Sequence, residues 1–121
     1  IAAAAGLKTM EILRRPGAYD TIRATGRSIM DALASNFSAV GLAAQVVGDP
    51  VLFDVVFTDS PVTNYRGVKR GDADRLKRFN ANLRARGVLK PPSKFYISLA
   101  HTSEDVDHAI QAIATAAREI G

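Results

Sequence analysis

The sequence predicts a small α+β domain, in which a three-stranded antiparallel or mixed sheet has helices packed on it. Apolar residues recur at helical spacing in several segments, and a strong turn signal separates two β-prone runs. A third β-prone run follows a pair of prolines and leads into a helix start. At 121 residues, with 47% apolar and 23% charged residues, the chain has the size and composition of one globular domain.

The first part of the chain predicts two helices. Residues 2–15 form the first, which Pro16-Gly17 ends. No capping residue precedes its alanines, which is what we expect of a fragment of a longer polypeptide. The residues expected to face inward are Ala3, Leu7, Met10, Ile12 and Leu13. Residues 19–37 form the second helix, and Gly26 within its apolar stripe predicts the close approach of another backbone.

Two strands are expected next, at 44–47 and 51–58, separated by the turn signal Gly48-Asp49-Pro50. The second run is apolar on both sides, which is typical of a strand covered on each face. Asp54 is the exception within it. We expect this acid to pair with a neighbouring lysine or arginine, because an unpaired charge is rarely buried.

The rest of the chain predicts a short helical turn at 65–68 and a helix that starts at Asp72 or Asp74 and runs to Arg86. Gly87 can take the left-handed conformation that closes a helix. A strand at 95–99 and a helix at 103–120 are expected to follow. The possible capping residues of this last helix are Thr102 and Ser103.

Composition excludes several classes of function. The chain has no cysteine and two histidines, so neither a disulfide framework nor a metal site is expected. The net charge of +4 comes from 16 basic and 12 acidic residues that are interspersed, which does not favour nucleic-acid binding. No apolar run is long enough to cross a membrane. The opening alanines have no basic region before them, so we expect no signal peptide and a cytoplasmic protein.

Each candidate catalytic residue has a structural explanation. Ser98 and His101 flank a junction between a strand and a helix, where we expect them to satisfy backbone groups. His108 is expected on the solvated side of the last helix. Lys90 and Lys94 lie by the prolines and have no evident reason for a lowered pKa, so neither is expected to form a Schiff base.

Two stretches carry a resemblance to a known family. These are FTDSPVTNYRGVKRGDADRLKRFNANLRARGVL at 57–89 and FYISLAHTSEDVDHAI at 95–110. They resemble the C-terminal part of class III pyridoxal-phosphate-dependent aminotransferases, in the branch similar to glutamate-1-semialdehyde 2,1-aminomutase. The resemblance extends from Ala3 to Glu119, and its most specific pieces are Phe57-Thr58-x-x-Pro61-Val62-x-x-Tyr65, Gly87-Val88 and Ser98-Leu99-Ala100-His101-Thr102-x-Glu104-Asp105.

The resemblance implies that residues 1–121 are the C-terminal small domain of a larger enzyme. The family's Schiff-base lysine, pyridinium acid and phosphate site lie upstream, in a large cofactor-binding domain that is absent from this chain. No catalytic, cofactor-binding or metal-binding residue is therefore expected here. The full-length protein is expected to bind pyridoxal 5'-phosphate, to act on an amino-acid or amino-aldehyde substrate and to form a homodimer. The isolated chain is expected to be inactive, without bound cofactor.

The resemblance also implies candidates for the rim of the substrate site. In the aminomutase-like enzymes the segment before the last strand approaches the substrate and carries a glutamate. In this sequence Ser93, or Lys94 if the loop shifts, stands at that position. This difference leaves open an aminotransferase rather than an aminomutase. The alternative from another class is an independent, non-catalytic ligand-binding or protein-interaction domain of ferredoxin-like appearance.

Overall fold

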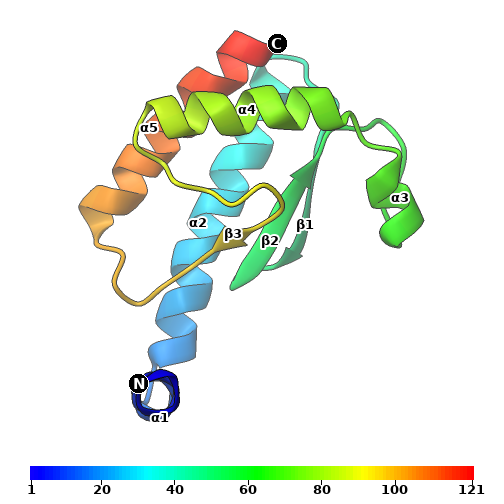
Figure 1. Cartoon of the computed structure of the whole chain (residues 1–121). Helices are drawn as coiled ribbons and strands as arrows, with labels where there is room; N and C mark the ends of the chain where they lie inside the picture. Colours follow the sequence, from blue (N-terminus) through cyan, green and yellow to red (C-terminus); the bar gives the residue numbers. More distant parts are fainter.

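A three-stranded antiparallel sheet and the helices around it make up the computed structural model, which describes residues 1–121 (Figure 1). The helices are α1 (Ala2–Leu13), α2 (Ala18–Ala39), α3 (Tyr65–Lys69), α4 (Ala73–Ala85) and α5 (Ser103–Ile120), and the strands are β1 (Gln45–Asp49), β2 (Leu52–Val56) and β3 (Phe95–Tyr96). The predicted fold class and element order are confirmed. Of the two sheet types left open, the structure has the antiparallel one.

The sheet has the order β1-β2-β3, so β2 is its central strand (Figure 1). In the register, Val46 lies opposite Val55, and Phe53 lies opposite Phe95. The third strand is shorter than the predicted run 95–99. The reason is local: beyond Tyr96 the backbone turns toward the start of α5, and the N–H of Ser98 donates to His101 instead of to a neighbouring strand.

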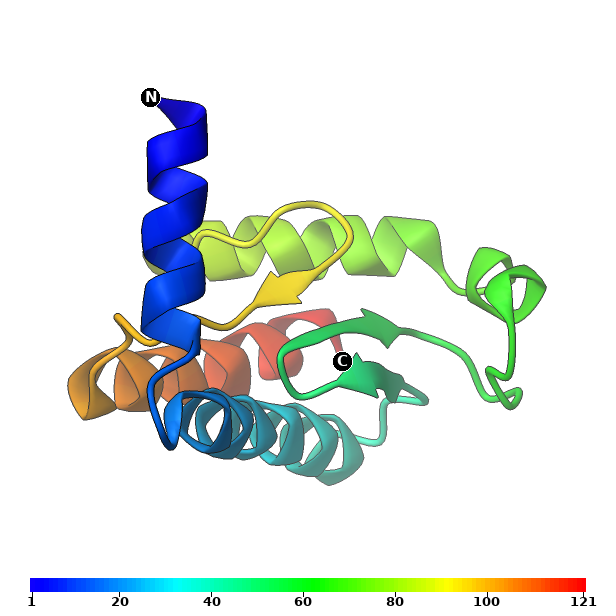
Figure 2. The ribbon, with the colours of Figure 1, turned by 90° about the horizontal axis from the view of Figure 1, so that it is seen from below.

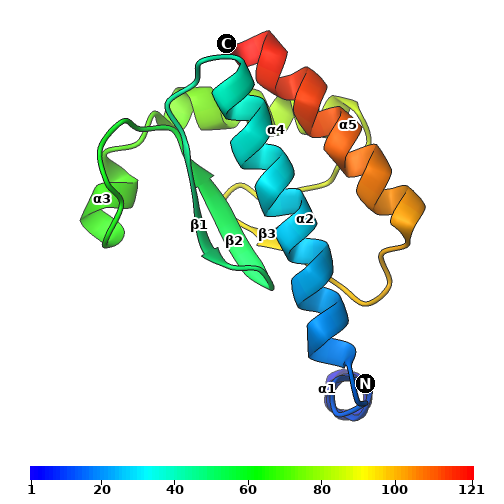
Figure 3. The same cartoon turned by 180° about the vertical axis from the view of Figure 1, so that it is seen from behind.

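Helix α2 lies against one face of the sheet and side by side with α5 (Figure 3), and α4 packs on α5. Aromatic rings fill the space between the layers. Phe37 of α2 meets Phe57 and Phe79 edge to face, with ring centroids 5.2 Å apart in each pair. Each ring is buried, and such edge-to-face pairs add about 1 kcal/mol to the free energy of burial. This cluster joins β2, α2 and α4 into one core.

Helix α1 differs from the sequence prediction. Leu7 and Met10 were expected to face inward, but 70% and 53% of their surfaces are exposed. Ala3 is also exposed, and among the residues expected inward only Ile12 and Leu13 are partly covered. The physical reason is that the chain turns sharply at Gly17, so that α1 projects away from the sheet and its helices (Figure 2). None of the helices has the length and apolar character that a membrane crossing requires.

Gly26 confirms the predicted close approach of two backbones. This residue is buried in α2 where the helix crosses the turn between β1 and β2. A Cβ atom at this position would overlap the carbonyl group of Pro50. The side chain of Arg23, one turn earlier, pairs with Asp49 at 2.7 Å. Because Gly26 has no side chain, helix α2 and the β1–β2 hairpin can lie in direct contact.

Replacing this glycine tests that contact. Gly26→Ala is expected to lower the free energy of unfolding of the chain by about 1–3 kcal/mol, because the new methyl group must displace backbone. Urea unfolding measures the change. Gly6→Ala is the matched control, since Gly6 is also helical but has open space around its Cβ position. Equal unfolding midpoints for the Gly26→Ala variant and the wild type would contradict the proposed packing constraint.

Candidate functional site

The loop between α4 and β3, which we call the proline loop (residues 87–94), is the candidate site. It begins where α4 ends: Gly87 has a φ of 80°, and the N–H of Val88 donates to the carbonyl of Leu83 at 3.0 Å. This is the left-handed helix stop that the sequence predicts. Pro91 and Pro92 follow and keep the chain out of helix.

Lys90 is a buried residue of the proline loop. Only 1% of its side chain is exposed, and its Nζ lies 3.2 Å from the carboxylate of Asp54. The same amine donates to the carbonyl of Pro91 at 3.1 Å and lies 5.0 Å from the ring centroid of Phe95. Burial lowers the pKa of Lys90, and the nearby carboxylate opposes that shift. The lowered pKa of Lys90 is therefore a consequence of tertiary packing, which the local sequence does not show.

Asp54 has the partner that the sequence prediction required. It lies on the central strand β2 and is buried, and its Oδ1 also accepts a hydrogen bond from the N–H of Val55 at 2.9 Å. The partner, Lys90, is 36 positions further along the chain and could not be chosen from the other basic residues by spacing. The pair joins the proline loop to the middle of the sheet.

Two further contacts fix the far end of the loop. The side-chain amide of Asn80, on α4, donates to the carbonyl of Pro92 at 3.1 Å. Phe95, the first residue after the loop, stacks on Phe53 of β2 with ring centroids 5.1 Å apart. The loop is therefore attached to α4 and to β2. Ser93 and Lys94 lie between these attachments.

The two sequence-predicted rim residues differ in exposure. Ser93 is exposed at the tip of the loop, and Lys94 is half-buried. The positive charge of Lys94 contributes to the lowered pKa of Lys90, so the two amines lie close enough to repel. Neither Ser93 nor Lys94 lines the cavity that lies behind the loop. The two rim candidates therefore do not contribute to this cavity.

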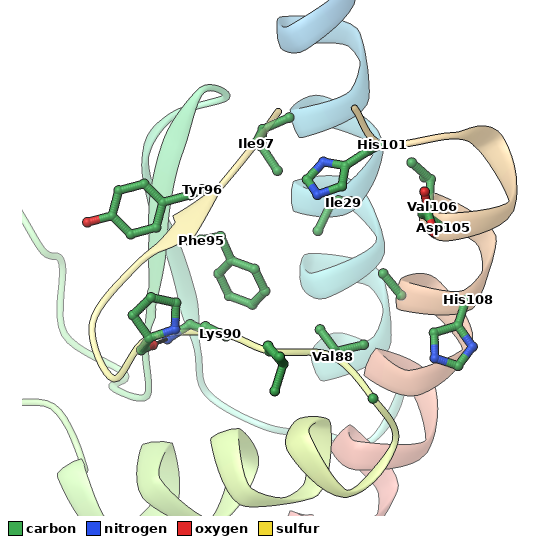
Figure 4. Close-up of a pocket in the computed structure, with 14 residues that line it drawn as sticks. Ile29, Val88, Lys90, Phe95, Tyr96, Ile97, His101, Asp105, Val106 and His108 are labelled. Carbon is green, nitrogen blue, oxygen red and sulfur yellow. Dashed lines mark hydrogen bonds between the residues drawn. The ribbon is translucent and has the colours of Figure 1, made fainter. Parts of the chain in front are cut away.

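A cavity of about 380 Å³ lies between the proline loop, the segment after β3 and the start of α5. In Figure 4 the rings of Phe95 and His101 point into this space, whereas Tyr96 points away from it. Most of the lining is apolar, with Ile29 of α2 among the residues that form it. The sequence prediction did not identify this cavity, because it forms only when residues 87–109 fold back on themselves and meet Ile29 of the distant helix α2.

The two histidines that line this cavity form hydrogen bonds with backbone groups. The Nδ1 atom of His101 accepts a hydrogen bond from the N–H of Ser98 at 3.2 Å, which confirms the structural role expected for this pair of residues. The Nε2 atom of His108 lies 2.7 Å from the carbonyl oxygen of Arg86, at the end of α4. His108 is exposed, as expected for the solvated side of the last helix, and its ring also ties α5 to the C-terminus of α4.

The start of α5 is fixed by a reciprocal pair of hydrogen bonds. The Thr102 hydroxyl accepts from the N–H of Asp105 at 3.2 Å, and the Asp105 carboxylate accepts from the N–H of Thr102 at 2.8 Å. This backbone hydrogen bond holds the pKa of Asp105 below its usual value, with the hydroxyl of Thr102 adding to the effect. The structure thereby selects Thr102, rather than Ser103, as the cap.

Comparison with known proteins identifies relatives over nearly the full chain. No family model matches the sequence. The sequence is 35% identical over 115 residues to a glutamate-1-semialdehyde 2,1-aminomutase of Brevibacillus brevis and 34% identical over 119 residues to one of Thermomicrobium roseum. The chain is homologous to part of these aminomutases. The matches cover 93% and 96% of this chain, but about a quarter of the relatives' length, 27% and 28%.

Solved structures show the same fold. An omega-transaminase from Sphaerobacter thermophilus is similar with a TM-score of 0.84 and 24% identity, over 96% of this chain and 27% of that one. The Sphingopyxis sp. MTA144 FumI protein, in its PLP internal aldimine form, is similar with a TM-score of 0.78 and 24% identity, over 97% of this chain and 26% of that one. The predicted resemblance to pyridoxal-phosphate-dependent aminotransferases is thus confirmed in both sequence and fold.

The buried lysine of this homologue does not fit the role of a cofactor-bearing lysine. The amine of Lys90 is held by the carboxylate of Asp54 and by the carbonyls of Pro91 and Pro92. A Schiff base at this atom would remove those bonds and leave the Asp54 carboxylate buried without its cation. In this structure the amine of Lys90 anchors the loop through these bonds.

The contribution of the Lys90–Asp54 pair to stability can be tested by comparing a variant that loses one partner with a variant that loses both. Lys90→Met is expected to lower the free energy of unfolding by about 3 kcal/mol, because it leaves a buried carboxylate uncompensated. Adding Asp54→Asn is expected to recover most of this loss, since the amide keeps an acceptor for the N–H of Val55. Urea unfolding of both variants measures the difference. If the double variant is as unstable as Lys90→Met, the buried charge is not the cause.

The cap of α5 predicts a dependence of stability on pH. Because the pKa of Asp105 is lowered on folding, its contribution is present above about pH 4, the pKa range of an unfolded aspartate, and is lost as the pH falls through the lower folded pKa. Asp105→Asn is expected to be less stable than wild type at pH 7 and to approach it near pH 2. Thermal unfolding across this range measures the difference, and a constant difference at every pH would exclude the carboxylate as its source.

Proposed function

We propose that the chain is the C-terminal small domain of a class III pyridoxal-phosphate-dependent enzyme, an aminotransferase or a glutamate-1-semialdehyde 2,1-aminomutase. The single observation that carries this proposal is the match of nearly the whole chain to about a quarter of the length of such aminomutases. The rest of their length leaves room for a large cofactor-binding domain in the same polypeptide. We place the complete protein in the cytoplasm, as a homodimer.

Chemistry is divided between the two domains in this proposal. Pyridoxal phosphate, bound to the large domain, supplies the electron sink for amino-group transfer. The residues of this chain bind and orient the substrate from the side. Lys94 is the cation for the substrate carboxylate, and Ser93 offers a hydroxyl at the loop tip. Pro91 and Pro92 lower the ordering cost of these contacts, because they restrict the unbound loop.

The rim residues favour a substrate that carries a carboxylate. The family's aminomutase-like members carry a glutamate where this sequence has Ser93 or Lys94. A lysine at this position attracts a carboxylate, whereas a glutamate repels one. A substrate that retains a carboxylate near the loop, as an amino acid does, is therefore favoured. We propose an amino-acid donor on this ground, with amino-aldehydes as the second substrate class.

The exposed face of α1 supports the presence of a neighbouring domain. Ile1, Leu7 and Met10 are large apolar side chains with more than half of their surface exposed. A contiguous apolar face on one helix is typical of a surface covered by another part of a protein. We propose that the large domain of the same polypeptide covers it. An independent protein-interaction module would instead use this face to bind a partner.

The proposal predicts different behaviour of the full-length protein and of residues 1–121. The full-length gene product is expected to show the absorbance of a lysine-bound pyridoxal phosphate and to transfer amino groups from amino-acid donors. Residues 1–121 alone are expected to show neither property, because their buried lysine is occupied by Asp54. Borohydride reduction followed by peptide mapping checks both samples. A saturable adduct at one lysine of the 121-residue chain would contradict the division between domains.

A further inference from the structure

The proline loop is anchored at both of its ends to consecutive residues of one strand. Lys90, on the near side, bonds to Asp54 of β2. Phe95, on the far side, stacks on Phe53, the residue before it. These two strand residues cannot move apart, because they belong to the central strand of the sheet. The four residues between the anchors are therefore closed into a short loop on a fixed base.

The ion pair of Lys90 and Asp54 fixes the position of the loop more than it stabilises the fold. A buried ion pair contributes little to stability compared with apolar side chains of the same volume, since both charges lose their hydration. Its hydrogen bonds, however, require one position of the amine. The Nζ atom of Lys90 meets the Asp54 carboxylate at 3.2 Å and the carbonyls of Pro91 and Pro92 at 3.1 Å and 3.4 Å. The amine thus links the sheet to the backbone of the loop.

The loop backbone between the anchors has little freedom left. Both prolines have a restricted φ, and the carbonyl of Pro92 is also held by the amide of Asn80. Only Ser93 and Lys94 lie beyond these constraints. Their positions therefore depend on the contact of Lys90 with Asp54 and on the stacking of Phe95.

We propose that Lys90 and Asp54 are positioning residues, which hold the proline loop so that Lys94 meets the substrate carboxylate. This inference rests on the proposed function of the full-length enzyme. Neither residue touches the substrate in this proposal; they act through Lys94. Without the pair, substrate binding must order the loop, and an ordering cost of this kind raises KM. The chemical step on the large domain is left unaffected.

The experiment uses steady-state kinetics of the full-length enzyme with its cofactor. The variants are Lys90→Met combined with Asp54→Asn, Lys94→Ala, and all three changes together. The paired change and Lys94→Ala are each expected to raise KM for the amino donor by about 3- to 10-fold, with kcat within about 2-fold. The triple variant is expected to match Lys94→Ala within about 2-fold, because the charged contact of Lys94 outweighs the single hydroxyl of Ser93 that remains on the loop. Lys77→Ala, an exposed lysine of α4, is the control and should leave KM unchanged.

Hydrogen exchange gives a second readout that does not depend on activity. The amides of Ser93, Lys94 and Phe95 are expected to exchange about 10-fold faster in the paired variant, while the melting temperature stays near that of the wild type. A purely structural role would instead lower the melting temperature and leave the KM of the folded enzyme unchanged. If the paired variant does not fold, Asn80→Ala removes one of the two hydrogen bonds to the carbonyl of Pro92 and should raise KM by a smaller factor.

The outcomes separate this inference from the proposed function. An unchanged KM in both the paired variant and Asn80→Ala would overturn the positioning role in an enzyme that still transfers amino groups. A further rise of KM in the triple variant above that of Lys94→Ala would show that the pair does not act through Lys94, and would also overturn it. A full-length protein without amino-transfer activity would overturn the proposed function, and unchanged exchange at Ser93 and Lys94 would then decide against the anchor as well.

Discussion

The central strand β2 constrains both the core and the candidate site. Phe53 and Val55 are buried in the core, and Phe57, just past the end of the strand, joins the aromatic cluster with Phe37 and Phe79. Asp54, between Phe53 and Val55, holds the proline loop through Lys90. The same strand therefore sets where the helices pack and where the loop lies. A shift of β2 by one residue would exchange the two roles, because successive side chains of a strand point to opposite faces.

Helices α4 and α5, which lie before and after the proline loop in the chain, have fixed ends next to it. Helix α4 stops at a left-handed glycine, and its last carbonyl groups are held by the turn after Leu83 and by His108 of α5. The capping box at Thr102 fixes where α5 begins. Between these two fixed helix ends lie only the proline loop, the two-residue strand β3 and residues 97–102. Such a short connection limits where its side chains can lie.

Helix α1 has the opposite character. It makes few contacts with the rest of the chain and leaves apolar side chains exposed, although its sequence has the spacing of an amphipathic helix. Exposed apolar side chains of this kind are typical of a surface that another part of a protein covers.

Local sequence determined the elements of this protein because their signals are local. The periodicity of α2 and α5, the prolines after α4, the helix stop at Gly87 and the turn before Val51 all act within a few residues. The family resemblance likewise lay in contiguous motifs, such as the segment from Ser98 to Asp105. The expectation that Gly26 meets another backbone was correct for the same reason, since glycine in an apolar stripe is informative by itself.

Only the tertiary structure decided which distant residues meet. It chose Lys90 as the partner of Asp54, although the chain has 16 lysines and arginines and spacing does not distinguish them. It also placed the apolar side of α1 in the open, ended β3 after Tyr96 and turned His108 toward Arg86. Each of these outcomes depends on how separate elements pack, and burial and charge pairing are properties of that packing. The sequence by itself determined the pieces of the domain, whereas the electrostatics of its loop required the fold.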